Sequence, residues 1–197
     1  MVKTYSLTKD EKTKLSDNFT VAEFACKDGS DRILIDSNLV EILQKIRNHF
    51  SKPLILTSAY RNAEYNRKIG GVSNSQHVLG KAADIYIQGT ECEDIAKYAE
   101  YLMPKSGGIG LYGNFVHIDV RANRSRWTNF GTERVVDGFP GFSPDVTAEI
   151  TAADAVAILT QKGIIASPGI WYEGTWTDTD FKQLLIKTAK YIRDKEG

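Results

Sequence analysis

The chain has 197 residues, and its 25 basic and 25 acidic side chains give a formal net charge of zero and a pI of about 6.8. This balance removes any electrostatic argument for binding to nucleic acid or to an anionic membrane surface. A hydrophobic content of 42% is typical of a globular protein with a packed core. The polar N-terminus lacks the apolar stretch of about 7–15 residues found in secretory signals, and no apolar run reaches the roughly 18 residues of a membrane span. We therefore expect a protein made and held in the cytoplasm, without membrane insertion.

The N-terminal part of the chain predicts two helices. The first dozen residues look like a polar arm. Thr20 then stands three residues before Glu23, an arrangement that caps the start of a short helix. Residues 37–50 predict an amphipathic helix whose apolar stripe is Leu39, Ile42, Leu43, Ile46 and Phe50. His49 falls in the last turn of this helix, where a solvated or dipole-complementing role is favoured over a ligand role.

The middle of the chain predicts a small sheet. Apolar and alternating runs indicate four strands, and one segment with acidic residues in its first turn indicates a helix. In chain order these elements are the strands 53–61 and 82–88, the helix 91–103 and the strands 107–113 and 115–120. Residues 62–76 look like a loop with paired glycines. The predicted fold class is α+β, with a small, mostly antiparallel sheet and flanking helices.

The C-terminal part of the chain differs in composition. Glycine and proline interrupt residues 137–145, so we expect a first domain over residues 1–135, a linker over 136–147 and a small helical module over 148–197. Two helices are expected in this module, over residues 152–162 and 178–192. Its tryptophans, Trp171 and Trp176, either form the core of the module or lie exposed, where they could stack on sugar rings.

Two of the three histidines, His77 and His117, stand in strand-flanking or strand segments together with Asp84. Two imidazoles and one carboxylate are a ligand set of catalytic zinc, which leaves a fourth position for water. The spacing alone also fits a second interpretation, in which His77 caps a loop, Asp84 starts a strand and His117 is a satisfied core histidine. No GxSxG motif is present, and neither Cys26 nor Cys92 has a histidine close by in the sequence, so no protein nucleophile is expected.

The residues around this set carry a more specific signal. "SQHVLGKAAD" matches the pattern SxHxxGxAxD, and it lies in an ordered series with "FTVAEFACKDG", "TSAYRNAEYNRKIGGVSNSQH" and "GGIGLYGNFVHIDVR". Over residues 17–130 the chain resembles the M15-type zinc peptidases, the group of D-Ala-D-Ala carboxypeptidases and L-alanyl-D-glutamate endopeptidases, and especially their bacteriophage endolysin members. The resemblance implies the hedgehog/D-Ala-D-Ala peptidase-like fold and a Zn²⁺ ion held by His77, Asp84 and His117.

The resemblance also implies a function in cell wall degradation. We expect a peptidoglycan hydrolase that cleaves a peptide bond in the murein stem peptide or cross-link and stays in the cytoplasm until host lysis releases it. Peptidoglycan is the expected partner, nucleic acid is not, and a monomer is expected. The C-terminal module would help the enzyme dock on the wall. Two alternatives remain open: a D,D-carboxypeptidase that acts on soluble precursors, and a non-catalytic wall-binding protein that keeps the fold.

Two polar residues near the ligand set have candidate roles at the substrate, and one of them, Arg61, matches the arginine that faces the substrate in this family. Arg61 is expected to bind a substrate carboxylate or to stabilise the oxyanion that forms in the reaction, and its alternative is a structural ion pair. Ser75 either hydrogen-bonds the substrate or orders the loop before His77. Gly80 and Ala82 are expected to be small because bulk would block the approach of the backbone to the metal loop.

The general base is the point where the family pattern breaks. Better-known relatives carry a carboxylate three residues before the second histidine, and this chain has Asn114 there. An amide cannot accept a proton at neutral pH. The candidate base is therefore Asp119, which should share a strand face with His117. Its competing role is that of a carboxylate that orients the imidazole, and a third possibility is that Asn114 marks lost catalysis.

Overall fold

The computed structural model describes residues 1–142 and, beyond them, residues 159–160, 164, 177, 179–180, 184 and 188. By its internal contacts the chain divides into two units, Met1–Phe142 and Ser143–Gly197. The division lies within the segment that the sequence predicts to be a linker, and Phe139 of that segment is buried in the core of the first unit. The predicted C-terminal helices lie outside the described residues except at those isolated positions, and Trp171 and Trp176 lie outside them altogether.

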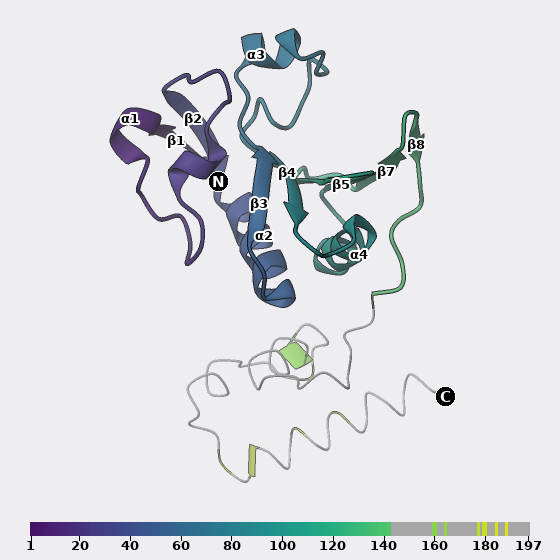
Figure 1. Ribbon diagram of the computed structural model, residues 1–197. Coiled ribbons are helices and arrows are strands. Elements are labelled where there is room, and N and C mark those ends of the chain that lie inside the picture. The colour runs from purple at the N-terminus through teal and green to yellow at the C-terminus, as the bar shows by residue number, and fades with distance from the viewer. Residues whose placement is uncertain are drawn as a thin grey trace. The chain divides into compact units, whose positions relative to one another are not determined.

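A six-stranded mixed sheet forms the centre of the first unit (Figure 1). In spatial order its strands are β3 (Leu54–Ser58), β4 (Ala82–Ile87), β6 (Val116–Asp119), β5 (Gly108–Tyr112), β7 (Ser125–Asn129) and β8 (Glu133–Val135). All neighbouring pairs are antiparallel except β5 and β7, which run parallel. The predicted α+β class with a mostly antiparallel sheet is therefore confirmed. The last two strands were not predicted.

The helices α2 (Ser37–Phe50) and α4 (Cys92–Leu102) were both predicted and pack on one face of this sheet. α2 begins at Asp36, whose carboxylate accepts a hydrogen bond from the Asn38 N–H at 2.9 Å. Under the helices lie fully buried side chains of alternate strand positions: Ile85, Ile109 and Ile118. Because successive strand side chains point to opposite faces, Asp84 and His117 project from the other face of the sheet.

The N-terminus is not a polar arm, contrary to the prediction. β1 (Val2–Ser6) pairs antiparallel with β2 (Arg32–Asp36) and leads into the short helix α1 (Leu7–Asp10). β2 supplies the buried Ile33 and Ile35, whereas most of β1 is exposed, so its sequence has no apolar alternation to reveal the strand. The predicted short helix after Thr20 is confirmed as the 3₁₀ helix η1 (Val21–Phe24), with its capping box intact.

The segment before His77 is more ordered than the loop that the sequence predicts. It contains the helix α3 (Ala63–Lys68), which begins at Asn62, where the side-chain oxygen accepts from the Tyr65 N–H at 2.8 Å (Figure 1). Farther on, Gly80 has a φ of +69°, and a Cβ there would overlap the Leu34 backbone of β2. The expectation that Gly80 permits a close backbone approach is confirmed, and the backbone that it approaches is that of β2.

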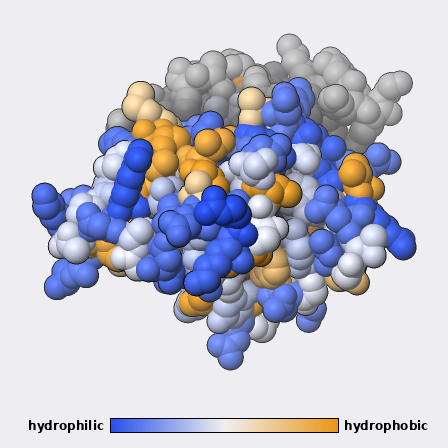
Figure 2. Space-filling view, turned by 90° about the horizontal axis from the view of Figure 1, so that it is seen from above, coloured by the Kyte–Doolittle hydropathy of each residue, from blue (hydrophilic) through white to orange (hydrophobic). Residues whose placement is uncertain are grey.

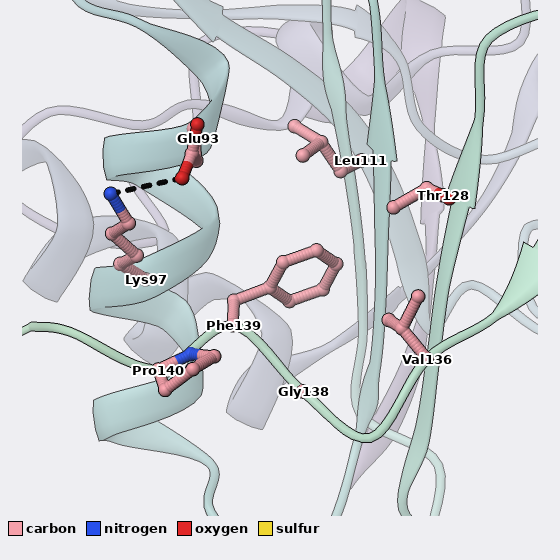
Figure 3. Close-up of a pocket in the computed structure, with 8 residues that line it drawn as sticks. All are labelled: Glu93, Lys97, Leu111, Thr128, Val136, Gly138, Phe139 and Pro140. Atoms are coloured by element: carbon pink, nitrogen blue, oxygen red, sulfur yellow. Dashed lines mark ion pairs between the residues drawn. The ribbon is translucent and has the colours of Figure 1, made fainter.

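A pocket lies on the helix-covered side of the sheet and is lined by Glu93, Lys97, Leu111, Thr128, Val136, Gly138, Phe139 and Pro140 (Figure 3). It includes none of the predicted metal ligands. On the face shown in Figure 2, hydrophobic side chains form small groups between hydrophilic ones. Within the part of the chain that the structure describes, no helix combines the length and the apolar character needed to cross a membrane.

Candidate metal centre

The structure brings the three predicted ligands together. Asp84 on β4 and His117 on β6 are directly paired across the two antiparallel strands. His77 reaches the same point from the turn that precedes β4. All three residues are buried, with exposed fractions of 3% for His77, 7% for Asp84 and 8% for His117. The sequence left open whether these three residues meet, and the structure shows that they do.

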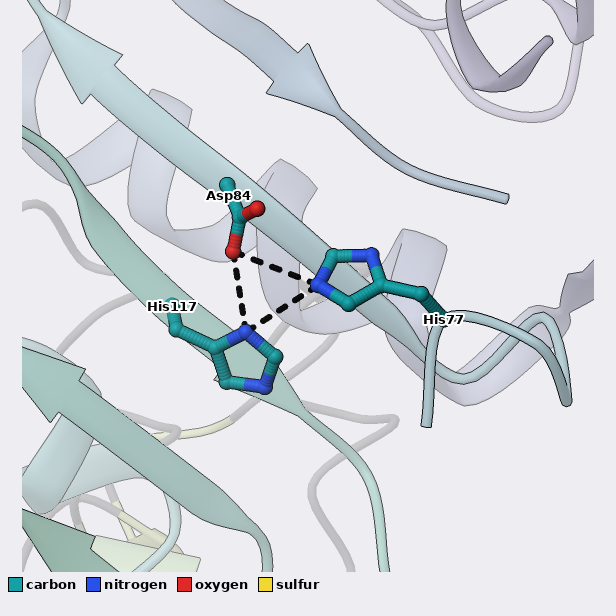
Figure 4. A group of neighbouring side chains, drawn as sticks. All are labelled: His77, Asp84 and His117. Carbon is teal, nitrogen blue, oxygen red and sulfur yellow. Dashed lines mark hydrogen bonds and ion pairs between the residues drawn. The ribbon is translucent and has the colours of Figure 1, made fainter. Parts of the chain in front are cut away.

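Their inward-facing atoms form a small triangle (Figure 4). His77 Nε2 lies 3.2 Å from His117 Nδ1 and 3.3 Å from Asp84 Oδ1, and His117 Nδ1 lies 2.9 Å from Asp84 Oδ1. Ligands at about 2.0–2.1 Å from a tetrahedral zinc ion lie about 3.3 Å from one another. The triangle therefore has the size that such an ion needs.

Hydrogen bonds on the outer side of each imidazole fix its orientation. His77 Nδ1 donates to the Ala59 carbonyl oxygen at 2.6 Å, which leaves the lone pair of Nε2 in the triangle. His117 Nε2 donates to Asp119 Oδ2 at 3.1 Å, which leaves the lone pair of Nδ1 there. Such outer hydrogen bonds are typical of histidines that bind metals. Three acceptor atoms then converge within hydrogen-bonding distance of one another, an arrangement that a cation stabilises.

The pKa shifts of the three residues also favour a positive charge at the triangle. Burial lowers the pKa of His77, so this ring is neutral at pH 7. Burial would also lower the pKa of His117, but its hydrogen bonds with Asp119 and Asp84 outweigh that effect and raise the pKa to about 9. Burial would raise the pKa of Asp84, yet hydrogen bonds from both histidines hold it well below the usual value. Without a metal, a proton on His117 supplies the positive charge that the convergent acceptors favour.

Asp119 lies on the side of His117 away from the triangle. It is fully buried, and besides His117 it accepts hydrogen bonds from the Gly108 N–H at 3.1 Å and from the Arg121 N–H at 3.0 Å and Nε at 2.8 Å. A Cβ at Gly108 would overlap its carboxylate, so a larger residue at that position would displace the carboxylate. Of the two roles left open for Asp119, this geometry favours orientation of the imidazole over proton transfer.

Arg61 holds the second oxygen of the ligand carboxylate. Its Nη2 lies 2.5 Å from Asp84 Oδ2, and its Nε donates to Ser58 Oγ at 2.8 Å. The guanidinium is mostly buried, with 15% of the side chain exposed. The contacts of Arg61 are thus those of the structural ion pair that the sequence left as the alternative to substrate binding.

The other predicted residues lie in the turns that precede His77 and β6. The Ser75 carbonyl accepts from the Val78 N–H at 3.1 Å, which shapes the turn that carries His77. Ser75 itself is nearly buried, at 9% exposure, which fits its loop-ordering alternative. Asn114 is exposed in the turn between β5 and β6.

Two aromatic residues beside the triangle were missed from the sequence. The Trp127 ring lies 5.2 Å from the His117 ring, and its indole N–H donates to the Tyr112 hydroxyl at 3.2 Å. A Cβ at Gly110 would overlap the indole, so this position of β5 must lack a side chain for Trp127 to reach His117. The alternating glycines 108 and 110 in "GGIGLYG" were a signal that one face of this strand accommodates other side chains.

Comparisons with known proteins place the chain in a family. Residues 17–119 match the family model described as Peptidase M15, and this range contains His77, Asp84 and His117. Over 65 residues the chain is 42% identical to the "Probable peptidoglycan L,D-endopeptidase MepK" of Haemophilus influenzae, a match that covers 32% of this chain and 34% of that protein. The chain thus spans about a third of the length of this relative. Since the family model covers more than half of the chain, the chain belongs to the peptidase M15 family.

Proposed function

We propose that the chain is a zinc-dependent peptidoglycan peptidase that hydrolyses a peptide bond in the murein stem peptide or cross-link. The observation that carries the proposal is the buried triangle of His77 Nε2, Asp84 Oδ1 and His117 Nδ1, with edges of 2.9 to 3.3 Å. Membership of the peptidase family and the similarity to a protein named as a peptidoglycan endopeptidase support the reaction and the substrate class.

In this proposal His77, Asp84 and His117 hold the zinc ion. A zinc ion held there would lower the pKa of a water molecule and would polarise the carbonyl of the scissile bond. The residues around the triangle keep its donors in place: the Ala59 carbonyl and Asp119 fix the two imidazole rings, as described above.

We assign Arg61 and Asp119 to positioning. Arg61 neutralises the outer oxygen of Asp84 and leaves Oδ1 to the metal. Asp119 is already engaged by His117, Gly108 and Arg121, so it is poorly placed to take a proton from a water molecule in the triangle. Asn114 cannot accept that proton because an amide is not basic at neutral pH.

The biological setting follows from the same proposal. We infer an endolysin-type role, in which the enzyme accumulates in the cytoplasm of a phage-infected cell and reaches the wall at lysis. Residues 148–197 would then form a helical module that docks on the wall. The zero net charge suits neither nucleic acid nor an anionic surface as the partner.

The test is digestion of purified sacculi by the full chain, metal-free and zinc-loaded, with the released fragments identified by mass spectrometry. We expect zinc-dependent release of peptide fragments, lost in His77→Ala. His49→Ala is the matched control, because His49 stacks on Tyr98 at 3.8 Å between ring centroids and takes no part in the triangle.

Two outcomes would contradict the proposal. If the metal-free and zinc-loaded chains are equally inert and both bind sacculi, the protein is a wall-binding module without catalysis. If the zinc-loaded chain releases D-alanine from a soluble pentapeptide and leaves sacculi intact, it is a D,D-carboxypeptidase.

A further inference from the structure

Tyr112 has no role in the mechanism proposed above. It is a polar residue on the face of the sheet from which Asp84 and His117 project. It is the last residue of β5, in register two positions beyond Gly110, which pairs with His117. Because alternate strand residues share a face, Tyr112 projects on the same side of the sheet as His117 and Asp84. Its side chain is half-buried, and its hydroxyl contacts Trp127, whose ring lies 5.2 Å from the His117 ring.

Two aromatic neighbours hold the Tyr112 ring in place. It stacks on Phe115, with 4.2 Å between ring centroids and an interplanar angle of 14°. Its hydroxyl accepts the indole N–H of Trp127 at 3.2 Å, and the Trp127 ring in turn lies 5.2 Å from the His117 ring. A single side chain therefore connects the hydroxyl to a metal-binding imidazole, and the ring has little freedom to turn away.

The Trp127 contact uses a lone pair of the hydroxyl and leaves its proton free for another acceptor. A phenol has one O–H donor, and an indole N–H can only donate. Burial raises the pKa of Tyr112, and the nearby Asp84 carboxylate adds to that effect, so the hydroxyl stays protonated at neutral pH. The side chain is thus a neutral hydrogen-bond donor, fixed in orientation, beside a site that would polarise a carbonyl group.

We propose that Tyr112 is a catalytic residue whose hydroxyl donates a hydrogen bond to the carbonyl oxygen of the scissile peptide bond as negative charge develops on it. The proposal rests on the proposed peptidase function. Water forms the new C–O bond, the C–N bond breaks, and the proton that water loses ends on the departing amine. The tyrosine proton stays on its oxygen throughout, so the hydroxyl contributes only while the oxyanion exists.

The competing interpretation is that Tyr112 only completes the aromatic packing at the end of β5. Tyr112→Phe separates the two, because it keeps the ring and its stack on Phe115 and removes only the hydroxyl. Trp127 would lose an acceptor, so Tm and zinc content are measured for each variant, and kinetics are compared at a temperature at which all variants are folded. Tyr5→Phe, on β1 and away from the triangle, is the matched control.

The experiment measures kcat and KM of the zinc-loaded full chain on a defined murein peptide, and the Ki of a phosphinate analogue that mimics the tetrahedral intermediate. For Tyr112→Phe we expect a loss of about 100-fold in kcat, with KM and zinc content unchanged, and a similar loss of affinity for the phosphinate. Tyr5→Phe should match the wild type in all of these.

Failure of this inference and failure of the proposed function give different results. If the wild type turns over and Tyr112→Phe retains kcat and phosphinate affinity within about threefold, the hydroxyl does not act in the reaction and the packing interpretation holds. If the zinc-loaded wild type does not cleave the murein peptide or sacculi, the proposed function is wrong and the role of Tyr112 falls with it.

Discussion

The Asp119 carboxylate lies 3.1 Å from His117 Nε2, so it binds the ring nitrogen that the metal triangle does not use. This contact fixes the tautomer of His117 and directs the lone pair of Nδ1 toward His77 and Asp84. A carboxylate in this position increases the basicity of a ligand histidine. Metal affinity, measured together with turnover, therefore distinguishes a role of Asp119 in orienting His117 from a role as the general base.

Asp119→Asn should weaken zinc binding by about 10–100-fold, because the amide is a poorer partner for His117 Nε2–H and leaves Arg121 without its counter-charge. Competition with a chromophoric chelator measures the zinc affinity. At saturating zinc, much of the turnover should return. Loss of turnover at full zinc occupancy and unchanged zinc affinity would instead identify Asp119 as the general base.

Gly108→Ala should reproduce part of this effect without touching any polar group. The added Cβ would overlap the Asp119 carboxylate, which must then shift away from His117. We expect zinc affinity to fall by about tenfold. Gly113→Ala is the control, because a Cβ there meets nothing within 4 Å, and the same chelator titration should detect no change. Equal zinc affinities for the two variants would mean that the position of Asp119 does not matter to the metal.

Arg61→Ala should destabilise the metal-free protein, because it removes the guanidinium from Oδ2 of the buried Asp84 and leaves only the histidine contacts at Oδ1. Removal of one partner of a buried pair costs about 3 kcal/mol in the free energy of unfolding. The loss should be smaller with zinc bound, since the metal then neutralises Asp84. Urea unfolding with and without zinc measures both values, with the exposed Arg67→Ala as the control. Unchanged stability together with a raised KM would restore the substrate-binding role expected from the sequence.

Local patterns explain which parts of the fold and the site were predictable. The stripe from Leu39 to Ile46 is set by helical periodicity, and α2 is found where that pattern predicts it. The ligand types of His77, Asp84 and His117, with their surrounding motif, indicated a common site before any distance was known. Strand alternation also placed Asp119 on the same face as His117, and their side chains do meet.

The remaining features depend on contacts between distant segments. β1 is exposed and is stabilised by pairing with β2, some thirty residues away, as in the pair Thr4 with Leu34. Trp127 reaches His117 because β7 pairs in parallel with β5, a register that no local pattern in the sequence indicates. Alternation cannot tell which imidazole nitrogen Asp119 binds, and that detail decides between its two roles.

The buried Arg126 on β7 forms an ion pair that should make the free energy of unfolding depend on pH. Its side chain is fully buried and pairs with Glu100 of α4 at 2.5 Å. Burial would raise the pKa of Glu100, but hydrogen bonds from Arg126 and Arg124 outweigh it and hold the pKa below its usual value. A carboxyl group with a lowered folded-state pKa stabilises the fold above its unfolded-state pKa, and this contribution is lost as pH falls through the folded-state value.

Glu100→Gln should therefore lower the free energy of unfolding by about 3 kcal/mol at pH 7, since Arg126 loses its counter-charge. The difference from the wild type should shrink as the pH falls from the unfolded-state pKa of Glu100 through its lower folded-state pKa, because Glu100 of the wild type is then neutral in the folded state as well. Urea unfolding from pH 7 down to pH 3 measures this convergence. Glu93→Gln, which removes an exposed partner of Lys97, should change stability by less than about 0.5 kcal/mol at every pH. A difference for Glu100→Gln that stays constant with pH would show that the charge of Glu100 is not what stabilises the contact between α4 and β7.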